Sequence, residues 1–551
     1  MRSLAMLVAQ ASLSMAKPLA NLAGSLTKPI NASQPLDGFI SYSIEFSSFP
    51  DFAGNLSHPN EFSNNLLNNL ASLAGTKPYI RVGGNTQDYA IYNPDLAVAL
   101  NGTYNLSRSA DYPTTIEIGP SYFESYHTWP DVKFSHGFNL GGNHDDRQWE
   151  SLLETAAVAC KAIGKDRLYW WEYGNEPDLF TTSNQGPVRS PEYNESDYVT
   201  EWLNGTRAIR DVIESNCPDL LSHDTYGYLA PSFAGINNHL KSSVTWADGL
   251  DKDESIKLFS SHNYISSSDT PGVTLQGTLM NHTRTSLSIA SHTAEKAALH
   301  PSTPYILGET NSLSKQGRPG LSNSFGAALW ALDFAVQCAT TAAGIDRVHF
   351  HMGTDYRYAS WQPVDTNKTA RGTKPPYYGN IAAAMFLVGG SAGTTATVVP
   401  VSFEADDDDD ASGETDVAYA AYDTAGALTR ILVLNLRAYN YTLNGTGGPE
   451  LDPAPRSVRT YRLIVGDQNV DAVVRRLHAN GSDAVTGITW DGWSYNYELD
   501  RGRPVRLDNV TVGETVAVIS GGEVLVDVPD SEAVVLDFGD AGRGGVWRRT
   551  D

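Results

Sequence analysis

Residues 168–177, LYWWEYGNEP, predict a buried strand that ends in a turn. The stretch is rich in aromatic residues, which favour strands, and Gly174 and Pro177 end it. Just before it, in residues 147–163, apolar side chains recur at steps of three and four, as they do along one face of a helix. These residues together therefore predict a helix followed by a strand.

The same alternation fills the first two thirds of the chain. Helical patterns recur between β-rich runs, and the clearest others cover residues 61–74 and 325–343. Eight such strand–helix units predict an α/β fold, a (β/α)8 TIM barrel. A doubly wound open sheet is the alternative, but GFISYSIEF (38–46) is not followed by the Gly-rich phosphate loop usual after its first strand. The eight β-rich runs begin near Gly38, Pro78, Val132, Leu168, Leu220, Ile256, Pro304 and Ile345.

Beyond about residue 390 the helical pattern stops. Short alternating segments such as DVAYAAYD (416–423) follow, separated by Gly, Pro, Asn and Asp, which is typical of an antiparallel β-sandwich. The acidic run 406–410 is expected to be a solvated loop. The predicted division is a signal peptide at 1–16, an N-terminal stretch that joins the β-domain at 17–37, a catalytic barrel at 38–390 and a β-sandwich domain at 391–551.

Charge and cysteine content exclude several classes of protein. The 551 residues include 39 Lys and Arg against 63 Asp and Glu, so the formal net charge is −24. A surface this acidic repels nucleic acids and anionic membranes, and no run of 18 apolar residues could span a bilayer. The three cysteines, Cys160, Cys217 and Cys338, contain no CxxC pair and allow at most one disulfide, whose pairing the sequence does not give.

The N-terminus and the sequons favour secretion. Arg2 precedes a short apolar segment and the small-x-small site at residues 14–16, in the order of a secretory signal. The chain also has more Asn-x-Ser/Thr sequons than chance would give, which predicts a secreted glycoprotein. The sequons begin at Asn31, Asn55, Asn101, Asn105, Asn194, Asn204, Asn281, Asn367, Asn440, Asn444, Asn480 and Asn509.

Two carboxylates are candidates for catalysis. Glu176 follows the fourth β-rich run and Glu309 ends the seventh, and reacting groups of such barrels lie at the carboxyl ends of the strands. A retaining glycosidase needs such a pair, one as nucleophile and one as acid/base, about 5–5.5 Å apart. Asn175 can donate a hydrogen bond to the sugar 2-hydroxyl. Glu172 shares the strand face of Glu176 and is expected to lie deeper in a structural role.

Three motifs resemble glycoside hydrolase family 79, which holds β-glucuronidases and heparanase-type endoglucuronidases. They are RVGGNTQD (81–88), WEYGNEPDLF (171–180) and LGETNS (307–312). The resemblance covers the whole chain and implies that Glu176 is the general acid/base and Glu309 the nucleophile. The uninterrupted length is more similar to that of the microbial exo-acting β-glucuronidases.

The resemblance also implies a set of substrate contacts. Tyr264 is expected to hydrogen-bond the nucleophile, and Glu45, Asn85 and His351 are expected to contact the sugar. Arg81 points from the second strand and is expected to position Glu309 or Asn175. Gly83 and Gly84 allow close approach to the sugar or simply form a tight turn.

The segment after the eighth run is the expected receptor of the uronate carboxylate. In the family this loop uses backbone N–H groups and tyrosine hydroxyls, so Gly353, Tyr356 and Tyr358 are the candidates, with Arg357 as a further electrostatic contact. Trp361 either stacks on a sugar face or packs in the interior.

The predicted function is therefore that of a retaining exo-β-glucuronidase acting on β-linked glucuronic acid, including its 4-O-methyl form. The alternatives are a β-glucosidase, glucanase or arabinofuranosidase of the same clan, or a non-catalytic sugar-binding relative. A neutral-sugar enzyme has no need of a carboxylate receptor at 353–361. No metal, organic cofactor or obligate protein partner is expected, and the expected partner is a carbohydrate substrate.

Overall fold

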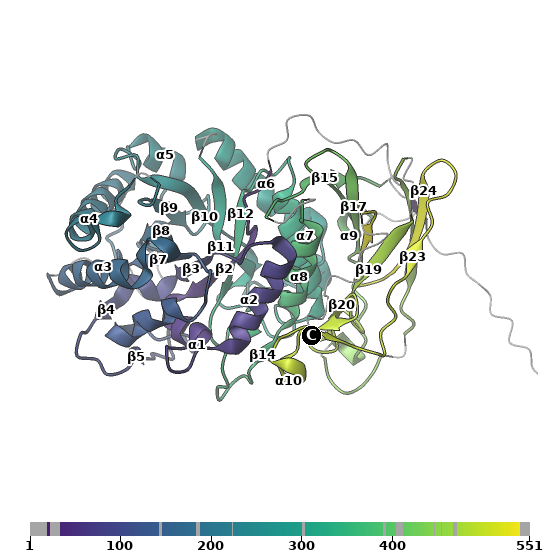
Figure 1. Cartoon of the computed structure of the whole chain (residues 1–551), viewed down its shortest axis with the longest axis horizontal. Coiled ribbons are helices and arrows are strands. Elements are labelled where there is room, and N and C mark those ends of the chain that lie inside the picture. Colours follow the sequence, from purple (N-terminus) through teal and green to yellow (C-terminus); the bar gives the residue numbers. More distant parts are fainter. Residues whose placement is uncertain are drawn as a thin grey trace, which may run out of the picture.

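A computed structural model of the chain places a barrel and a β-domain side by side (Figure 1). The barrel contains the predicted repeating units, and the β-domain follows it in the chain. The structure describes residues 19–21, 34–142, 146–182, 188–222, 224–299, 303–389, 393–403, 412–445, 447–452, 454–466 and 471–539.

Eight parallel strands close into a ring in which each strand pairs with the next along the chain, and the last pairs with the first. This confirms the TIM barrel, and the doubly wound sheet is wrong. The fifth run begins later than predicted, because residues 218–220 form a short 3-10 turn before the strand. The barrel strands are β2 (Ile40–Glu45), β3 (Ile80–Gly83), β7 (Phe134–Phe138), β8 (Leu168–Tyr173), β9 (Tyr228–Phe233), β10 (Ile256–Ser267), β11 (Tyr305–Ser314) and β12 (Arg347–Met352).

Helices surround the barrel, and local sequence sets their limits. The helix predicted at 61–74 begins after Asn60, whose side chain accepts from the N–H of Ser63, and ends at Gly75, which is left-handed with φ 79°. The helix predicted at 325–343 ends at Ala339, because Thr340 is extended and bridges Val398 in the β-domain. The helices of this part are α1 (Phe49–Ala53), α2 (Glu61–Ala74), α3 (Asp146–Arg167), α4 (Glu195–Asn216), α5 (Ser242–Ala247), α6 (His282–Leu299), α7 (Phe325–Ala339) and α8 (Pro375–Phe386).

The barrel carries two additional small sheets, one after β3 and one after β12. Between β3 and β7 the chain forms a small sheet of β4 (Ala90–Tyr92), β5 (Leu100–Thr103) and β6 (Thr115–Ile118). After β12 it forms a short hairpin of β13 (Trp361–Gln362) and β14 (Gly372–Thr373). Both additions begin at the carboxyl ends of their strands, which places them at the mouth of the barrel.

The β-domain consists of two sheets with a second apolar core between them, which confirms the sandwich. In the small sheet, β1 (Leu19–Asn21) pairs parallel with β18 (Val458–Ile464), which pairs antiparallel with β24 (Glu523–Pro529). The N-terminal stretch thus contributes one strand to this domain. The other elements of the domain are β15 (Thr397–Val401), β16 (Asp416–Tyr422), β17 (Leu428–Asn435), β18 (Val458–Ile464), β19 (Ala472–His478), β20 (Thr489–Trp490), β21 (Trp493–Ser494), β22 (Val505–Arg506), β23 (Thr515–Val516), β24 (Glu523–Pro529), β25 (Glu532–Asp537), α9 (Ser412–Thr415) and α10 (Tyr497–Asp500).

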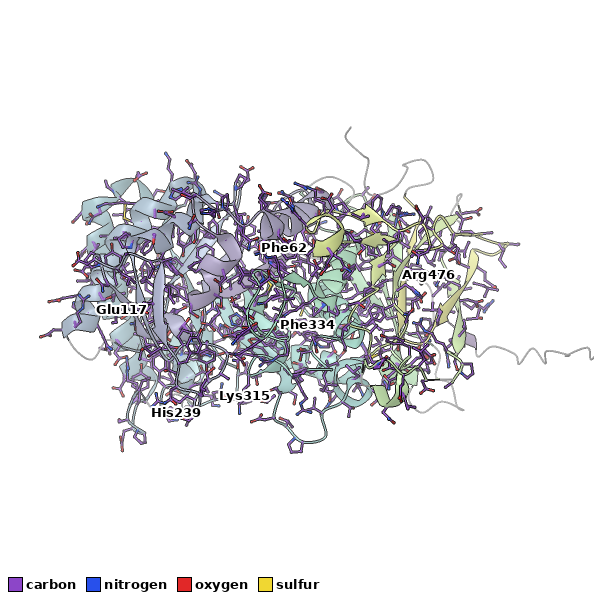
Figure 2. All side chains as sticks on the ribbon, turned by 90° about the horizontal axis from the view of Figure 1, so that it is seen from below. Phe62, Glu117, His239, Lys315, Phe334 and Arg476 are labelled. Carbon is purple, nitrogen blue, oxygen red and sulfur yellow. A yellow bond between two sulfur atoms is a disulfide. The ribbon has the colours of Figure 1, made fainter. Side chains whose placement is uncertain are left out.

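The two domains meet along α7, which is apolar almost all round because both of its sides are covered. Its residue Phe334 is buried near the middle of the molecule, whereas Arg476 lies in the β-domain (Figure 2). At this contact the N–H groups of Phe325 and Gly326 donate to the carbonyls of Ala484 and Ser482, each at 2.7 Å.

The domain limit predicted at 390/391 and the signal peptide predicted at 1–16 stay predictions, because residues 390–392 and 1–16 lie outside the described ranges. The acidic run 406–410 also lies outside them.

The single disulfide joins Cys160 of α3 to Cys217 at the end of α4, and Cys338 is a buried free thiol. It links two neighbouring helices that surround the barrel. Among the described residues, the structure has no helix of the length and apolar character needed to cross a membrane.

Candidate active site

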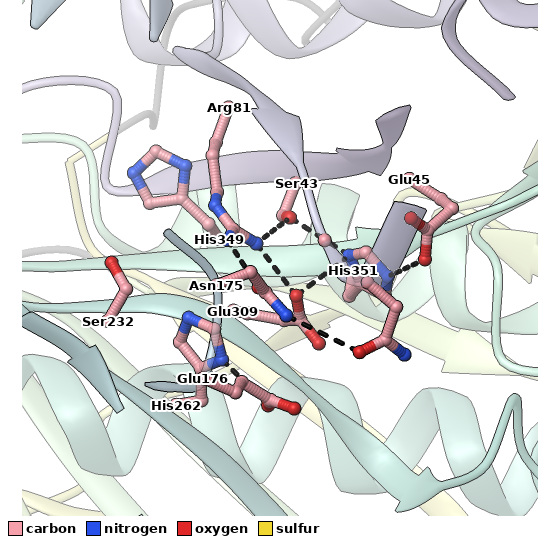
Figure 3. A network of polar contacts seen from close by, with 12 residues as sticks. Ser43, Glu45, Arg81, Asn175, Glu176, Ser232, His262, Glu309, His349 and His351 are labelled. Carbon is pink, nitrogen blue, oxygen red and sulfur yellow. Dashed lines mark hydrogen bonds and ion pairs between the residues drawn. The ribbon is translucent and has the colours of Figure 1, made fainter. Parts of the chain in front are cut away.

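Five of the predicted site residues lie in one polar network around Arg81 (Figure 3): Glu45, Asn175, Glu176, Glu309 and His351. Arg81 lies on β3, Tyr264 on β10, Glu309 on β11 and His351 on β12, while Glu176 lies three residues after the end of β8. Parallel strands end at the same edge of a barrel, so residues far apart in the sequence share one pocket.

Arg81 lies at the centre of the polar network and is fully buried. Its Nη1 is 2.7 Å from Glu309 Oε2, and its Nη2 donates to Asn175 Oδ1 at 2.7 Å. Its Nε is 2.8 Å from Glu172 Oε2, and Ser43 accepts a further bond at 3.0 Å. Arg81 thus contacts both of the residues that it was expected to position, and Glu172 lies deeper as its structural partner.

Glu309 is held in its ionised form. Its Oε1 accepts the hydroxyl of Tyr264 at 2.7 Å, while Arg81 contacts Oε2. Burial acts to raise the pKa of Glu309, but His351, Arg81 and the hydrogen bond from Tyr264 outweigh it, so this pKa lies below the usual range of a glutamate. A carboxylate that stays ionised and fixed at both oxygens is suited to nucleophilic attack.

Glu176 is held in its protonated form. Burial and the nearby charge of Glu309 raise the pKa of Glu176 above the usual range of a glutamate. One of its oxygens and one of Glu309 lie within 4.8 Å of each other. Its backbone is left-handed, with φ 50°, and its N–H donates to Ser232 O at 2.9 Å, so the main chain itself fixes where this side chain starts.

His262 is a site residue that the sequence analysis missed. Its Nδ1 lies 2.9 Å from Glu176 Oε1. Burial lowers the pKa of His262 to about 4, which favours the neutral form of the ring beside Glu176. A signal was present, because His262 and Tyr264 are two positions apart on one strand and so share a face.

Among the described residues, Glu176, His262 and Glu309 are the group of ligating side chains close enough to hold a metal ion. Each of the three already contacts a protein group, since His262 contacts Glu176, and Arg81 and Tyr264 contact Glu309. A cation there would meet the fixed positive charge of Arg81 at 2.7 Å from the same carboxylate. The arrangement therefore favours acid–base chemistry over metal binding.

Glu45 is bound by protein groups on both of its oxygens. Oε1 accepts the N–H and the hydroxyl of Thr86 at 2.9 and 2.7 Å, and Oε2 accepts the hydroxyl of Tyr356 at 3.0 Å. His351 Nε2 lies 3.5 Å from Oε2. Gly84 has φ +106°, and a Cβ there would lie 2.8 Å from Glu45 Oε1, so this glycine is needed for the approach of the carboxylate.

A second residue that the sequence analysis missed supports Asn175. Asp88 Oδ2 accepts the N–H of Asn175 at 2.9 Å, and Asn175 Nδ2 donates to Asn85 Oδ1 at 3.4 Å. Burial raises the pKa of Asp88 to about 7. Asp88 is the last residue of the RVGGNTQD motif, so its position beside the glycines was the available signal.

The segment after β12 forms one wall of the site. A Cβ on Gly353 would lie 2.6 Å from the ring of Tyr356, so only glycine allows the two to pack as they do. The ring of Tyr358 lies 6.1 Å from that of Tyr264 and 6.2 Å from that of His351. Trp361 packs in the interior rather than on a sugar, since it is fully buried and donates its indole N–H to Ser63 at 2.9 Å.

Two curated relatives of this chain carry the same name. A curated β-glucuronidase of Neurospora crassa is 56% identical over 500 residues, which cover 86% of this chain and 87% of that protein. A β-glucuronidase of Aspergillus niger is 51% identical over 522 residues, 93% of each chain. The family model described as "Glycosyl hydrolase family 79 C-terminal beta domain" matches residues 418–535.

Solved structures agree with the fold. The crystal structure of a 4-O-α-L-rhamnosyl-β-D-glucuronidase from Fusarium oxysporum is 25% identical with a TM-score of 0.72, and the match covers 94% of this chain and all of that one. A family 51 arabinofuranosidase from Xanthomonas axonopodis is 15% identical with a TM-score of 0.58 over 94% of this chain and 99% of that one. The second likeness shows the shared architecture alone.

Proposed function

Because this chain belongs to glycoside hydrolase family 79, we propose that it is a retaining exo-β-glucuronidase that releases β-linked glucuronic acid. The observation that carries the mechanism is the pair Glu176 and Glu309. Their oxygens lie within 4.8 Å, and their surroundings shift their pKa values in opposite directions. An inverting enzyme would hold its carboxylates about 6.5–9.5 Å apart to leave room for water.

In the first step Glu309 attacks the anomeric carbon while Glu176 gives its proton to the glycosidic oxygen. The bond between that carbon and oxygen breaks, the aglycone leaves as an alcohol, and the sugar remains as an ester of Glu309. In the second step ionised Glu176 takes a proton from water, the water oxygen attacks the anomeric carbon, and the ester breaks. Two displacements restore the original anomeric configuration.

The substrate class follows from the wall formed after β12. We assign the receptor of the uronate carboxylate to the main chain at Gly353 and the hydroxyls of Tyr356 and Tyr358, as expected from the sequence. To donate to that carboxylate, the hydroxyl of Tyr356 must turn away from Glu45, to which it donates in the structure. Glucuronidase relatives that match most of the chain support this assignment over a neutral-sugar enzyme. Asn175 directly precedes the acid/base in the chain and is assigned to the sugar 2-hydroxyl.

Release rates from a panel of aryl β-glycosides test the function. The wild-type chain is expected to cleave the glucuronide with a kcat/KM at least about a hundredfold above those for the glucoside, galactoside and xyloside. The three neutral sugars have no carboxylate, so the hydrogen-bond donors of the receptor would lack a partner when these sugars bind. A 4-O-methyl glucuronide in the same panel measures whether the 4-position tolerates a substituent. A preference for any neutral sugar would contradict the proposal.

The pH profile of kcat/KM is expected to be bell-shaped, with both limbs set by the catalytic pair. Glu309 must be ionised, and its lowered pKa puts the acid limb below the ordinary glutamate value of about 4.3. Glu176 must be protonated, and its raised pKa puts the basic limb above that value. In Glu176→Gln, measured with an activated aryl substrate, the basic limb is expected to vanish. Its persistence would assign that limb to another group.

We also propose that the protein is secreted and N-glycosylated, which the sequon count supports. Exposure separates usable from unusable sequons. Asn101, Asn204 and Asn367 are exposed, whereas Asn281 is 6% exposed and its side chain accepts from the N–H of Arg284 at the start of α6. Glycopeptide mass spectrometry of protein secreted by a fungal host is expected to find glycan on the exposed sites and none on Asn281. Glycan on Asn281 would contradict the burial argument.

A further inference from the structure

Arg357 lies between two tyrosines of the site wall but bonds to other parts of the molecule. The rings of Tyr356 and Tyr358 lie 5.6 Å apart. Arg357 stands between them in the sequence. Its Nη2 is 2.8 Å from Asp111 Oδ2, and its Nε donates to Gly317 O at 3.2 Å. Nη1 donates to the carbonyl of Asp355 at 3.4 Å. Each guanidinium nitrogen thus has a protein partner.

These contacts join three loops at the mouth of the barrel. Asp111 belongs to the insertion between β3 and β7, Gly317 follows β11, and Arg357 follows β12. In the barrel β11 neighbours β12, and β2 separates β12 from β3. The Asp111–Arg357 pair therefore connects loops on either side of β2. Strand β2 ends at Glu45, which accepts the hydroxyl of Tyr356.

The loop after β11 has an unusual backbone where it meets Arg357. Lys315, Gln316 and Gly317 are all left-handed, with φ of 59°, 62° and 78°. Left-handed backbone is costly for residues other than glycine and persists only where surrounding contacts hold it. Here the carbonyl of Gln316 accepts the N–H of Arg357 at 2.9 Å, next to the bond from Gly317 O to the side chain. Lys315 marks this loop in Figure 2.

The pair is largely shielded from solvent. The Asp111 side chain is 14% exposed and the Arg357 side chain 23%, and Lys368 adds a second cation 3.4 Å from Asp111. Arg357 and Lys368 lower the pKa of Asp111 despite its partial burial, so the carboxylate stays charged at neutral pH. An ion pair this buried constrains its loops more than an exposed one would.

We propose that Asp111 and Arg357 form a positioning pair that fixes Tyr356 and Tyr358 for recognition of the substrate carboxylate. Arg357 does not itself bind that carboxylate, which differs from the electrostatic contact expected from the sequence. The inference rests on the proposed β-glucuronidase function. The pair would determine substrate specificity by holding the two tyrosines in place, without touching the reacting atoms.

The variant Asp111→Asn separates positioning from direct binding, because the two roles predict opposite results. If Arg357 bound the substrate carboxylate, losing Asp111 would free its guanidinium and remove a negative charge, so KM for a glucuronide would fall or stay the same. If the pair positions the wall, KM is expected to rise about tenfold or more while kcat changes less, since small misplacement of a binding group is costly.

Inhibition constants for a charged and a neutral sugar distinguish positioning from a general loss of structure, because a general loss would weaken both. In Asp111→Asn and in Arg357→Lys, the inhibition constant of glucuronate is expected to weaken about tenfold, with inhibition by neutral glucose unchanged. Lysine keeps the charge but cannot make the forked contacts, so it should not rescue the site. The double variant Asp111→Arg, Arg357→Asp keeps an ion pair between the two positions with the charges exchanged. It should restore part of the affinity for glucuronate.

The matched control is Asp253→Asn, which breaks the ion pair of Arg207 with Asp253 on the outside of the barrel, at 2.7 Å. It should leave KM at the wild-type value. Thermal unfolding of every variant checks that the chain is folded. A raised KM in Arg357→Lys but not in Asp111→Asn would overturn positioning in favour of direct binding. Unchanged KM in both would also overturn it. Wild-type protein that cleaves no glucuronide would instead defeat the proposed function.

Discussion

Replacing Glu309 with glutamine is expected to abolish hydrolysis while the chain stays folded. Glutamine has nearly the shape of glutamate and keeps an oxygen for the hydroxyl of Tyr264, and Arg81 retains its ion pair with Glu172 at 2.8 Å. A neutral amide, however, is not a nucleophile toward the anomeric carbon. The covalent route is lost, so kcat for an aryl glucuronide should fall by at least about a thousandfold.

The control for this variant is Glu154→Gln, which removes a carboxylate from an exposed ion pair with Arg147 and should retain wild-type activity. Retention of more than about a tenth of the activity in Glu309→Gln would contradict the nucleophile assignment. In Glu309→Ala, added azide should attack the anomeric carbon directly and give the α-glycosyl azide. A β-glycosyl azide from this variant would show that another residue forms the covalent intermediate.

Replacing Glu176 with alanine is expected to separate substrates by their leaving groups. A poor leaving group needs a proton as its bond to the sugar breaks, so its hydrolysis should slow by about 100- to 10,000-fold. An activated aryl group leaves as a stable anion, and its first step should slow far less. The structural reason is that burial and the charge of Glu309 raise the pKa of Glu176, so it holds the proton that the aglycone requires.

The measurement is kcat/KM for a series of aryl glucuronides of rising leaving-group pKa. A much steeper dependence on that pKa in Glu176→Ala than in the wild type is the expected result. Equal losses across the series would exclude Glu176 as the acid. Azide should accelerate the variant on the activated substrate and give the β-glycosyl azide, because the intermediate on Glu309 is still formed.

Local sequence was sufficient for the architecture and for placing Glu176 and Glu309 in one pocket. Alternation with a period of two or of three to four residues predicted the strands and helices, and eight repeats predicted the closed barrel. The helix at 61–74 matched α2 to the residue, since Asn60 and Gly75 are strong local end signals. Glu176 and Glu309 could be placed in one pocket because parallel strands of a barrel end at one edge.

The sequence was less informative about the partners of each side chain. It placed Arg81 near Glu309 or Asn175, and the structure shows both contacts and a third to Glu172. It missed His262, although the strand pattern put it on the face of Tyr264. Trp361 turned out to be interior, because Ser63, nearly 300 positions earlier, accepts its indole N–H.

The periodicity of apolar residues was thus enough to predict the barrel, the sandwich and the mouth where two glutamates meet, since each strand and helix is signalled by residues close together in the sequence. The opposite protonation of these glutamates, and the joining of three loops by Asp111 and Arg357, arise from contacts between residues up to 246 positions apart. Such contacts depend on strand register, loop path and burial. Those are properties of the folded chain, so no local pattern could have revealed them.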